Sequence, residues 1–486
     1  MIRVRGGVLQ IFQFSNLNFQ FKIVILQPIL NDMKKGTQLI SFAVIVLLFF
    51  MWGFITCMND LLIPKFKDMF ELSYGASMFV QFSFFGAYFI GSLVYFIISV
   101  AAGDPISKLG YKYGILAGLV VAAGGCALFY PASVSHSYVL FLVGLFVIGL
   151  GVTLLQIAAN PYVTILGEPD GASGRLNLSQ AFNSLGTTLA PMVGGIMLAR
   201  LSDAAHIHIP YLILCGMFLL LAVMIAVVPL PSFKNEEKVK MGAQALKDPL
   251  LLFGILAIFC YVGAEVCIGS SFKNCAKQLI PDIPEEKSNI LLAFYWGGLM
   301  IGRFLGSLSL VNFRNKFAKY GLMTVVSLAT FAALLGITYF LHPHTFSPKD
   351  MLPYLAFIVI NIFAFMAGQS HSTKLIAVFS GVNIIFLICA MVVTGYPAIW
   401  LLVGTGLFNS VMWGNIFSSA IARLGQYKAQ GSSLLVMAIV GGALLPLLQG
   451  FLADAMHGYH YTYLVPILAY AYLVFFGIKC TKELKK

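Results

Sequence analysis

The sequence predicts an all-α integral membrane protein: two bundles of six membrane-spanning helices, with a two-helix hairpin inserted in the second half. The first ground is composition, because 59% of the 486 residues are hydrophobic and only 10% are charged, whereas soluble domains carry about 25% charged residues. The second is a series of apolar runs of membrane-spanning length, and the third is an internal repeat. Lipid is therefore the predicted surroundings of most of the surface.

The apolar runs have the length that a bilayer requires, about 20 residues each. They are continuous rather than alternating, which indicates helices and not the strands of a barrel. In chain order they cover residues 37–61, 76–102, 112–131, 138–163, 176–200, 209–230, 250–272, 288–311, 318–341, 351–368, 373–395, 397–421, 432–454 and 460–478. Twelve are expected to form the core, and the pair at 318–368 is expected to be the inserted hairpin, which leaves the topology of the rest unchanged.

Loop charges predict the orientation, because lysine and arginine accumulate on the cytoplasmic side. With the N-terminus inside, most of the basic loop residues fall on the cytoplasmic side. The outer side then receives only Lys65, Lys67, Arg200, Lys273, Lys277, Lys287 and Lys349. We expect a multi-pass protein of the cytoplasmic (inner) membrane, with both termini cytoplasmic, that works as a monomer.

Four segments are predicted along the chain. Residues 1–32 are an N-terminal extension that is neither a signal peptide nor a full span. Met33 opens a basic start to the first span, so this extension is either an artefact of start-site choice or an amphipathic lead. Residues 33–231 form the N-terminal bundle, 232–249 a charged cytoplasmic linker, and 250–486 the C-terminal bundle with the hairpin.

The two halves share a pattern of small residues and proline. Gly186, Pro191 and Gly195 recur as Gly441, Pro446 and Gly450, all displaced by 255 positions. This displacement maps the fifth span onto the penultimate one. A parallel repeat across a cytoplasmic linker is the architecture of the major facilitator superfamily.

Several function classes are excluded. The net charge of +12 lies on loops beside the spans, with no basic water-facing domain for nucleic acid. The eight cysteines lack metal-ligand spacing, and no GxxxxGK[ST] motif is present to drive an ATP-dependent pump. We find no catalytic constellation, and we expect no enzyme activity, cofactor or metal site.

Polar residues inside spans are costly in lipid and are therefore candidates for function. Trp52, Thr56 and Asp60 recur every fourth residue, so they share one helix face. An aromatic ring and a carboxylate suit a sugar, which presents apolar faces and hydroxyl edges. The alternative is that Asp60 lies at the outer water boundary and only ends the helix before Pro64.

Two further spans carry amide side chains. Gln156 and Asn160 lie one turn apart in the fourth span, and Gln180 and Asn183 lie on one stripe of the fifth. Amides both donate and accept hydrogen bonds, as hydroxyl ligands require. The alternative is hydrogen bonding between helices that only holds the bundle together.

The second half contributes one acid inside a span, Glu265, and two further candidate substrate-binding residues, Asn409 and Trp413. Glu265 lies near the middle of span seven, where desolvation favours its uncharged form, which makes it a candidate proton carrier. The alternative is a glutamate neutralised by a basic neighbour, for which Arg303 is the candidate. Asn409 and Trp413, one turn apart, are expected to contact the substrate from this half.

Several motifs together resemble the fucose–galactose–glucose:proton symporters of the major facilitator superfamily. They are MWGFITCMNDLLIP, IAANPYVTILG, RLNLSQAFNSLGTTLAP and GSSLLVMAIVGGALLPLLQGFLAD. The resemblance covers most of the chain from Met33 onward, without the hairpin. It implies that Asp60 takes part in sugar binding and proton coupling, and that Trp52, Gln180 and Asn183 contact the sugar.

The chain departs from the fucose permeases in ways that favour the glucose/galactose branch. Gln156, which cannot titrate, stands where fucose permeases have a glutamate, and Gly269 lies near the place of a missing span-seven tryptophan. YVGAEVCIGS resembles the glucose/galactose branch, so the second proton site is expected to be Glu265.

These observations predict a secondary transporter that imports a hexose, glucose or galactose, by proton symport with alternating access. The alternatives are a sodium-coupled carrier, or a carrier for fucose, mannose, N-acetylglucosamine or a disaccharide. A sugar sensor without a transport cycle is a further alternative, although the coupling acids Asp60 and Glu265 are present.

Overall fold

The computed structural model describes residues 36–102, 105–166, 172–200, 207–228, 230, 244–310, 315–369, 371–424 and 428–483. Within these ranges all regular secondary structure is helical, and fourteen helices are long and apolar enough to cross a membrane. The predicted extension 1–32 and most of the predicted linker 232–249 lie outside the described residues.

The first half has six membrane-spanning helices or helix pairs. Its elements are α2 (Gly36–Met69), α3 (Tyr74–Ser77), α4 (Phe79–Ala102), α5 (Pro105–Leu109), α6 (Tyr111–Ala127), α7 (Phe129–Val134), α8 (Tyr138–Ile165), α9 (Ala172–Leu189), the π-helix η2 (Ala190–Gly194), α10 (Gly195–Arg200) and α11 (His208–Val227). Pro191 lies in η2, where the missing N–H of proline disrupts the α-helical pattern. Ser137 caps α8 by accepting a hydrogen bond from the Leu140 N–H.

The second half has eight spans. Its elements are η4 (Gln244–Lys247), α12 (Pro249–Leu279), α13 (Glu285–Leu310), α14 (Lys316–Leu341), η5 (Pro348–Met351), α15 (Pro353–Ala367), α16 (Ser372–Val392), α17 (Tyr396–Asn409), α18 (Met412–Ala420), α19 (Lys428–Met437), η7 (Ala438–Val440), α20 (Gly441–Ala455) and α21 (Leu464–Glu483). Asp248 and Asn315 cap α12 and α14 through their side chains.

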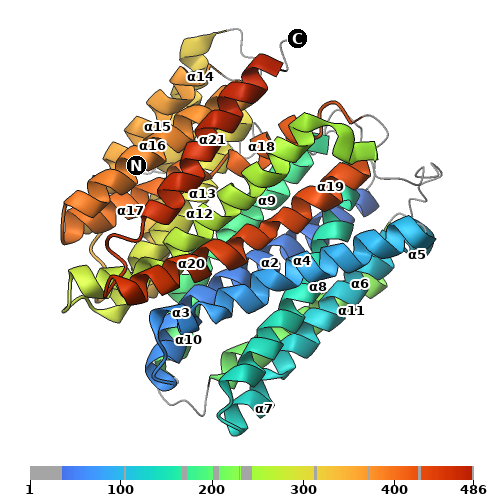
Figure 1. Cartoon of the computed structure of the whole chain (residues 1–486), viewed down its shortest axis with the longest axis horizontal. Helices are drawn as coiled ribbons and strands as arrows, with labels where there is room; N and C mark the ends of the chain where they lie inside the picture. The colour runs from blue at the N-terminus through green and yellow to red at the C-terminus, as the bar shows by residue number, and fades with distance from the viewer. Residues whose placement is uncertain are drawn as a thin grey trace, which may run out of the picture.

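Helix packing repeats between the halves. In the first half α2 packs on α9, α4 on α8, and α6 on α11. In the second half α12 packs on α20, α13 on α17, and α16 on α21 in the same way. The blue and cyan helices of the first half and the yellow to orange helices of the second lie on opposite sides of Figure 1, with α12 and α20 between them.

The repeated glycines make equivalent contacts. A Cβ atom at Gly186 would lie 2.1 Å from the Phe50 carbonyl oxygen on α2, and one at Gly441 would lie 2.0 Å from the Phe259 carbonyl oxygen on α12. Only glycine permits helices to approach this closely. The displacement of 255 positions in the sequence is therefore a repeat of packing as well.

Helices α14 and α15 stand outside the paired contacts, which supports the proposal that they are an inserted hairpin. The Phe331 and Tyr354 rings hold them together, stacked with centroids 5.3 Å apart. The hairpin also reaches the first half, because the Thr338 hydroxyl lies 3.8 Å from the Met192 sulfur in η2. The hairpin thus packs beside the interface between the two halves.

The outer surface of the bundles is apolar, as lipid requires. Large hydrophobic side chains are exposed along several spans, among them Leu220 and Val223 on α11, Phe340 on α14, and Ile385 and Val392 on α16. In a water-soluble protein such a surface would be a liability, whereas in a bilayer it faces hydrocarbon. Polar side chains lie instead between the helices.

Candidate functional site

Asp60 is the centre of the buried polar contacts between the halves. It lies in α2 well before the helix ends at Met69, and its side chain is 3% exposed. Its Oδ1 accepts hydrogen bonds from Gln81 Nε2 at 2.9 Å and Ser270 Oγ at 3.2 Å, and its Oδ2 accepts one from Trp296 Nε1 at 3.1 Å. The alternative that Asp60 only ends the helix is therefore wrong.

The donors to Asp60 come from both halves of the molecule. Gln81 lies on α4, in the first half, whereas Ser270 lies on α12 and Trp296 on α13, in the second. Gln81 Nε2 also donates to Ser270 Oγ at 2.8 Å. We call Asp60, Gln81, Ser270 and Trp296 the Asp60 cluster. Because three donors meet one carboxylate, the cluster is best satisfied when Asp60 is ionised.

The space beside Asp60 is shared between a glycine and a tryptophan. An ideal Cβ atom at Gly269 would lie 2.8 Å from Trp296 Cζ2 and 3.5 Å from Asp60 Oδ2. Gly269 thus leaves room for the indole of Trp296 to reach Asp60. Near the position where span seven lacks a tryptophan, the indole of Trp296 from the next span fills the space beside Gly269.

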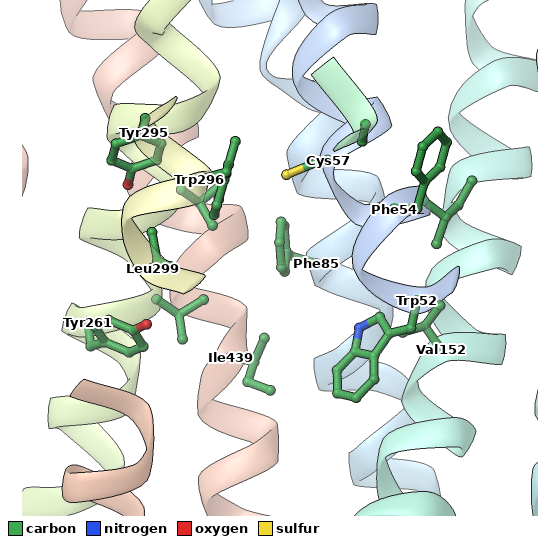
Figure 2. Packing of buried hydrophobic residues seen from close by; sticks show 14 of the residues in the cluster. Trp52, Phe54, Cys57, Phe85, Val152, Tyr261, Tyr295, Trp296, Leu299 and Ile439 are labelled. Carbon is green, nitrogen blue, oxygen red and sulfur yellow. The ribbon is translucent and has the colours of Figure 1, made fainter. Parts of the chain in front are cut away.

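Figure 2 shows how aromatic and apolar side chains face one another across the centre. Cys57, one turn before Asp60, points from α2 toward Trp296 on α13, and Phe85 lies between the two halves. Trp52 lies on the first-half side of this space, beside Val152. An aromatic platform and a carboxylate on one helix, as the sequence predicted, thus border the interface between the halves.

Tyr88 on α4 connects the predicted first-half residues. Its side chain is 1% exposed, and its hydroxyl interacts with the side chains of Gln156, Trp52 and Thr56. Phe49 packs against Trp52, with ring centroids 5.3 Å apart. These contacts connect the tryptophan and the amide through one buried tyrosine.

Glu265 and Arg303 face each other within the second half. Glu265 lies in the buried part of α12 and interacts electrostatically with Arg303. Tyr261 lies one turn before it, and its hydroxyl donates to the Asn409 carbonyl oxygen at 3.2 Å. Arg303 is partly exposed on α13 and crosses to the first half, where Nη1 donates to the Gln180 carbonyl oxygen at 3.1 Å and to the Ser184 hydroxyl. Arg303 thus lies in the electrostatic surroundings of Glu265 without a direct ion pair between them among the described residues, and its guanidinium joins the halves.

The predicted amides have different surroundings. Gln180 is partly exposed, and Arg303 binds its backbone rather than its side chain. Asn183 is tied to α2, where its Nδ2 donates to the Phe49 carbonyl oxygen at 3.0 Å. Asn160 has a buried Oδ1 without a hydrogen-bond partner among the described residues. Gln180 and Asn160 thus keep side-chain capacity for a ligand, whereas part of Asn183 holds helices together.

Asn409 and Trp413 are not one turn apart in a continuous helix, as the sequence predicted. Helix α17 ends at Asn409, and α18 begins only at Met412. Asn409 is fully buried: its Oδ1 accepts from Asn383 Nδ2 at 3.0 Å and from the Tyr470 hydroxyl at 2.7 Å, and its Nδ2 donates to the Tyr295 hydroxyl at 3.1 Å. Trp413 stacks on Phe417, with ring centroids 5.9 Å apart.

Sequence reasoning missed most donors to the central acids. For Asp60 they are Gln81, Ser270 and Trp296. Sequence reasoning also missed Tyr88, which interacts with Gln156 and Trp52, and the partners of Asn409, Tyr295 and Tyr470. One signal was available, because Gln81 is a polar residue inside a predicted span, as Asp60 and Gln156 are. Serine, tyrosine and tryptophan are common enough in membrane helices that their sequence positions carry little information.

Comparison with known proteins places the chain in a family. It is 40% identical to the glucose/galactose transporter of Brucella abortus biovar 1 (strain 9-941) over 450 residues, which cover 90% of this chain and 93% of that protein. It is 29% identical to the L-fucose-proton symporter of Escherichia coli (strain K12) over 474 residues, 91% and 94% of the two chains. No family model matches the sequence.

Solved structures agree with these relatives. The crystal structure of the major facilitator superfamily transporter FucP in the outward conformation aligns with a TM-score of 0.61 at 28% identity, over 91% of this chain and 99% of that one. A single-residue variant of the E. coli fucose:proton symporter aligns with a TM-score of 0.62 at 27% identity, with the same coverage. The chain therefore belongs to the fucose–galactose–glucose:proton symporter family of the major facilitator superfamily, a family of membrane transporters rather than enzymes.

Proposed function

We propose that the protein imports a hexose, glucose or galactose, by proton symport across the cytoplasmic membrane. The observation that carries this proposal is the buried Asp60 carboxylate, which lies between the two halves and accepts hydrogen bonds from each. A carboxyl group in this position can exchange a proton and couple that exchange to the relative movement of the halves.

The choice of sugar rests on relatives and on one departure. The B. abortus relative named glucose/galactose transporter is 40% identical, whereas the E. coli L-fucose-proton symporter is 29% identical. Gln156 replaces the span-four glutamate that the resemblance to fucose permeases would require. Glucose and galactose are therefore the proposed substrates.

The proposed binding site lies on the central faces of both halves. Trp52 stacks on the apolar face of the sugar, and Gln156, Asn160, Gln180 and Asn183 bond its hydroxyl groups. Asn409 and Trp413 act from the second half; for Asn409 this role requires exchange of its present bonds to neighbouring side chains.

Asp60 and Glu265 are the proposed proton-coupling acids. Glu265 faces Arg303, which also holds the Gln180 backbone of the first half. A change of charge at Glu265 therefore alters its electrostatic attraction for Arg303, and Arg303 makes the hydrogen bond that joins the second half to the first. The two bundles, formed by residues 33–231 and 250–486, then rock about the central site. The proposed protein is a monomer with both termini in the cytoplasm.

The test is uptake of labelled glucose into proteoliposomes that contain the purified protein. An inward proton gradient without sodium should drive accumulation that collapses with a protonophore and is competed by galactose. Fucose, mannose and N-acetylglucosamine serve as competitors of different stereochemistry. Sodium-dependent uptake would reject proton coupling, and competition by another sugar without glucose uptake would reject the hexose assignment.

The role of Glu265 has its own test. Glu265→Gln should abolish accumulation against a gradient and flatten the pH dependence of transport, because the amide cannot carry a proton. The matched control is Gln449→Ala on α20, since Gln449 is a buried polar residue whose side-chain amide donates to Thr462 rather than to either acid. Normal accumulation by Glu265→Gln with an unchanged pH profile would remove Glu265 from the mechanism.

A further inference from the structure

Two contacts join the halves at the same end of the molecule. One is the Asp60 cluster, which links α2 and α4 to α12 and α13. The other is Asp454 at the end of α20, whose carboxylate oxygens accept from the Tyr74 and Gly75 N–H groups of α3, both at 2.7 Å. Under the proposed orientation this is the outer end, so both contacts tie the two halves together on the outer side.

The Asp60 cluster differs from the Asp454 contact in the kind of donor. Asp454 accepts from backbone groups of a capped helical turn, where Ser73 also accepts from the Ala76 N–H. Asp60 accepts from side chains that can turn away: an amide, a hydroxyl and an indole. The Asp60 contact is thus the one that a single proton and a sugar hydroxyl can dissolve.

We propose that Gln81, Ser270 and Trp296 form a latch that closes the outer side on the ionised Asp60 carboxylate and releases when Asp60 binds a proton. They are positioning residues for the symport cycle. A proton on Oδ2 that points toward α13 puts two hydrogens between that oxygen and the indole nitrogen, and tryptophan has no acceptor to offer in return. The bond from Trp296 is then lost.

Other groups around Asp60 fit this assignment. Its own helix brings the Cys57 thiol, and α12 brings the Glu265 carboxyl group, the charged group among the described residues whose field reaches Asp60. Helices α4 and α13 contribute the neutral side chains of Gln81 and Trp296. The Gln81 Oε1 atom is buried without a partner among the described residues, so this amide can offer the carboxyl group an acceptor as well as a donor once the latch has released.

The latch would prevent a leak of protons. A carrier that has bound a proton but no sugar cannot close its outer side on Asp60, so it waits open until a sugar supplies contacts to both halves. A carrier that has released its proton inside can close the latch and complete the sugar-free part of the cycle. This inference rests on the proposed proton symport, but its structural part, closure on Asp60, can be tested without any sugar.

The test uses the native Cys57 thiol, which points toward Trp296 across the interface. Right-side-out vesicles are treated with a membrane-impermeant thiol reagent, and labelling is read by mass on the peptide that contains Cys57. Trp296→Phe and Ser270→Ala should each raise the labelling rate about tenfold at neutral pH, since a hydrogen bond to a charged group is lost. The matched control is Trp400→Phe on α17, which should label as the wild type does.

The pH dependence tests the proton. The quantity to compare is the Cys57 labelling rate of Trp296→Phe divided by that of the wild type. Both proteins contain Cys57 and Asp60, so the effect of pH on the thiol itself cancels in this ratio. It should fall toward one as the pH is lowered and Asp60 takes up its proton, and rise to about tenfold as the pH is raised, where the wild-type latch forms on ionised Asp60. A ratio of one at every pH would overturn the latch, and a constant high ratio would overturn its dependence on the proton.

Transport separates this inference from the proposed function. Trp296→Phe should slow net uptake while sugar exchange across the membrane stays near the wild-type rate, because exchange omits the sugar-free return. If labelling responds as expected and wild-type uptake is not proton-coupled, the symport proposal fails and the closing contact stands. If uptake is proton-coupled and neither variant changes Cys57 labelling, the latch is refuted and the symport proposal stands.

Discussion

Substitution of Gly269 by alanine tests the Asp60 cluster by adding one methyl group. The added Cβ would lie 2.8 Å from Trp296 Cζ2 and 3.5 Å from Asp60 Oδ2. Carbon atoms pack without repulsion at about 3.5–4.0 Å, so the indole must move by roughly 0.7 Å or α12 must shift. The methyl group thus stands beside both partners of the Trp296–Asp60 hydrogen bond.

The expected size of the effect follows from that hydrogen bond. Its length of 3.1 Å is already near the upper end of the usual range, so a displacement of this size breaks it. A hydrogen bond to a charged group contributes about 1.5–3 kcal/mol. The closed state of the ionised carrier should lose about that much, which corresponds to a roughly 10- to 100-fold change in population.

The assay measures Cys57 labelling, net uptake and sugar exchange for Gly269→Ala. Labelling should rise and net uptake should fall, with exchange preserved. Gly336→Ala is the matched control, because a Cβ there meets nothing within 4 Å. The reasoning is refuted if Gly269→Ala, folded and inserted, labels and transports as Gly336→Ala does.

Three further outcomes are expected. Asp454→Asn should raise Cys57 labelling less than Asp454→Ala does, because asparagine keeps one acceptor for the α3 N–H groups. Equal labelling rates for the two variants would contradict a role of the Asp454 contact in joining the halves. Tyr88→Phe should raise the KM for sugar several-fold, with Cys57 labelling unchanged, since its hydroxyl orients Trp52 and Gln156; an unchanged KM in uptake assays would count against that role. Arg303→Gln should lower net uptake about tenfold or more, because a charged hydrogen-bond donor to the first half is lost, and Arg303→Lys should recover part of the uptake. Wild-type uptake by Arg303→Gln would show that the contact of Arg303 with the first half is not needed for transport.

The fold could be predicted from the sequence because a bilayer leaves few alternatives. Lipid requires continuous apolar helices of a set length, so the spans are visible as runs, and the fourteen helices observed in the described part of the chain match them. The repeat was visible because close helix approach requires small residues at fixed spacing, as at Gly186 and Gly441. The end of the first span was misjudged, since α2 continues through Pro64 to Met69.

Asp60 could be singled out from the sequence, because a carboxylate inside a span is costly wherever the span lies. Its partners could not. Gln81, Ser270 and Trp296 stand 21, 210 and 236 positions away along the chain, and their residue types are ordinary in membrane helices. Only the packing of the second half against the first, with Gly269 leaving room for the indole, brings these donors to one carboxylate.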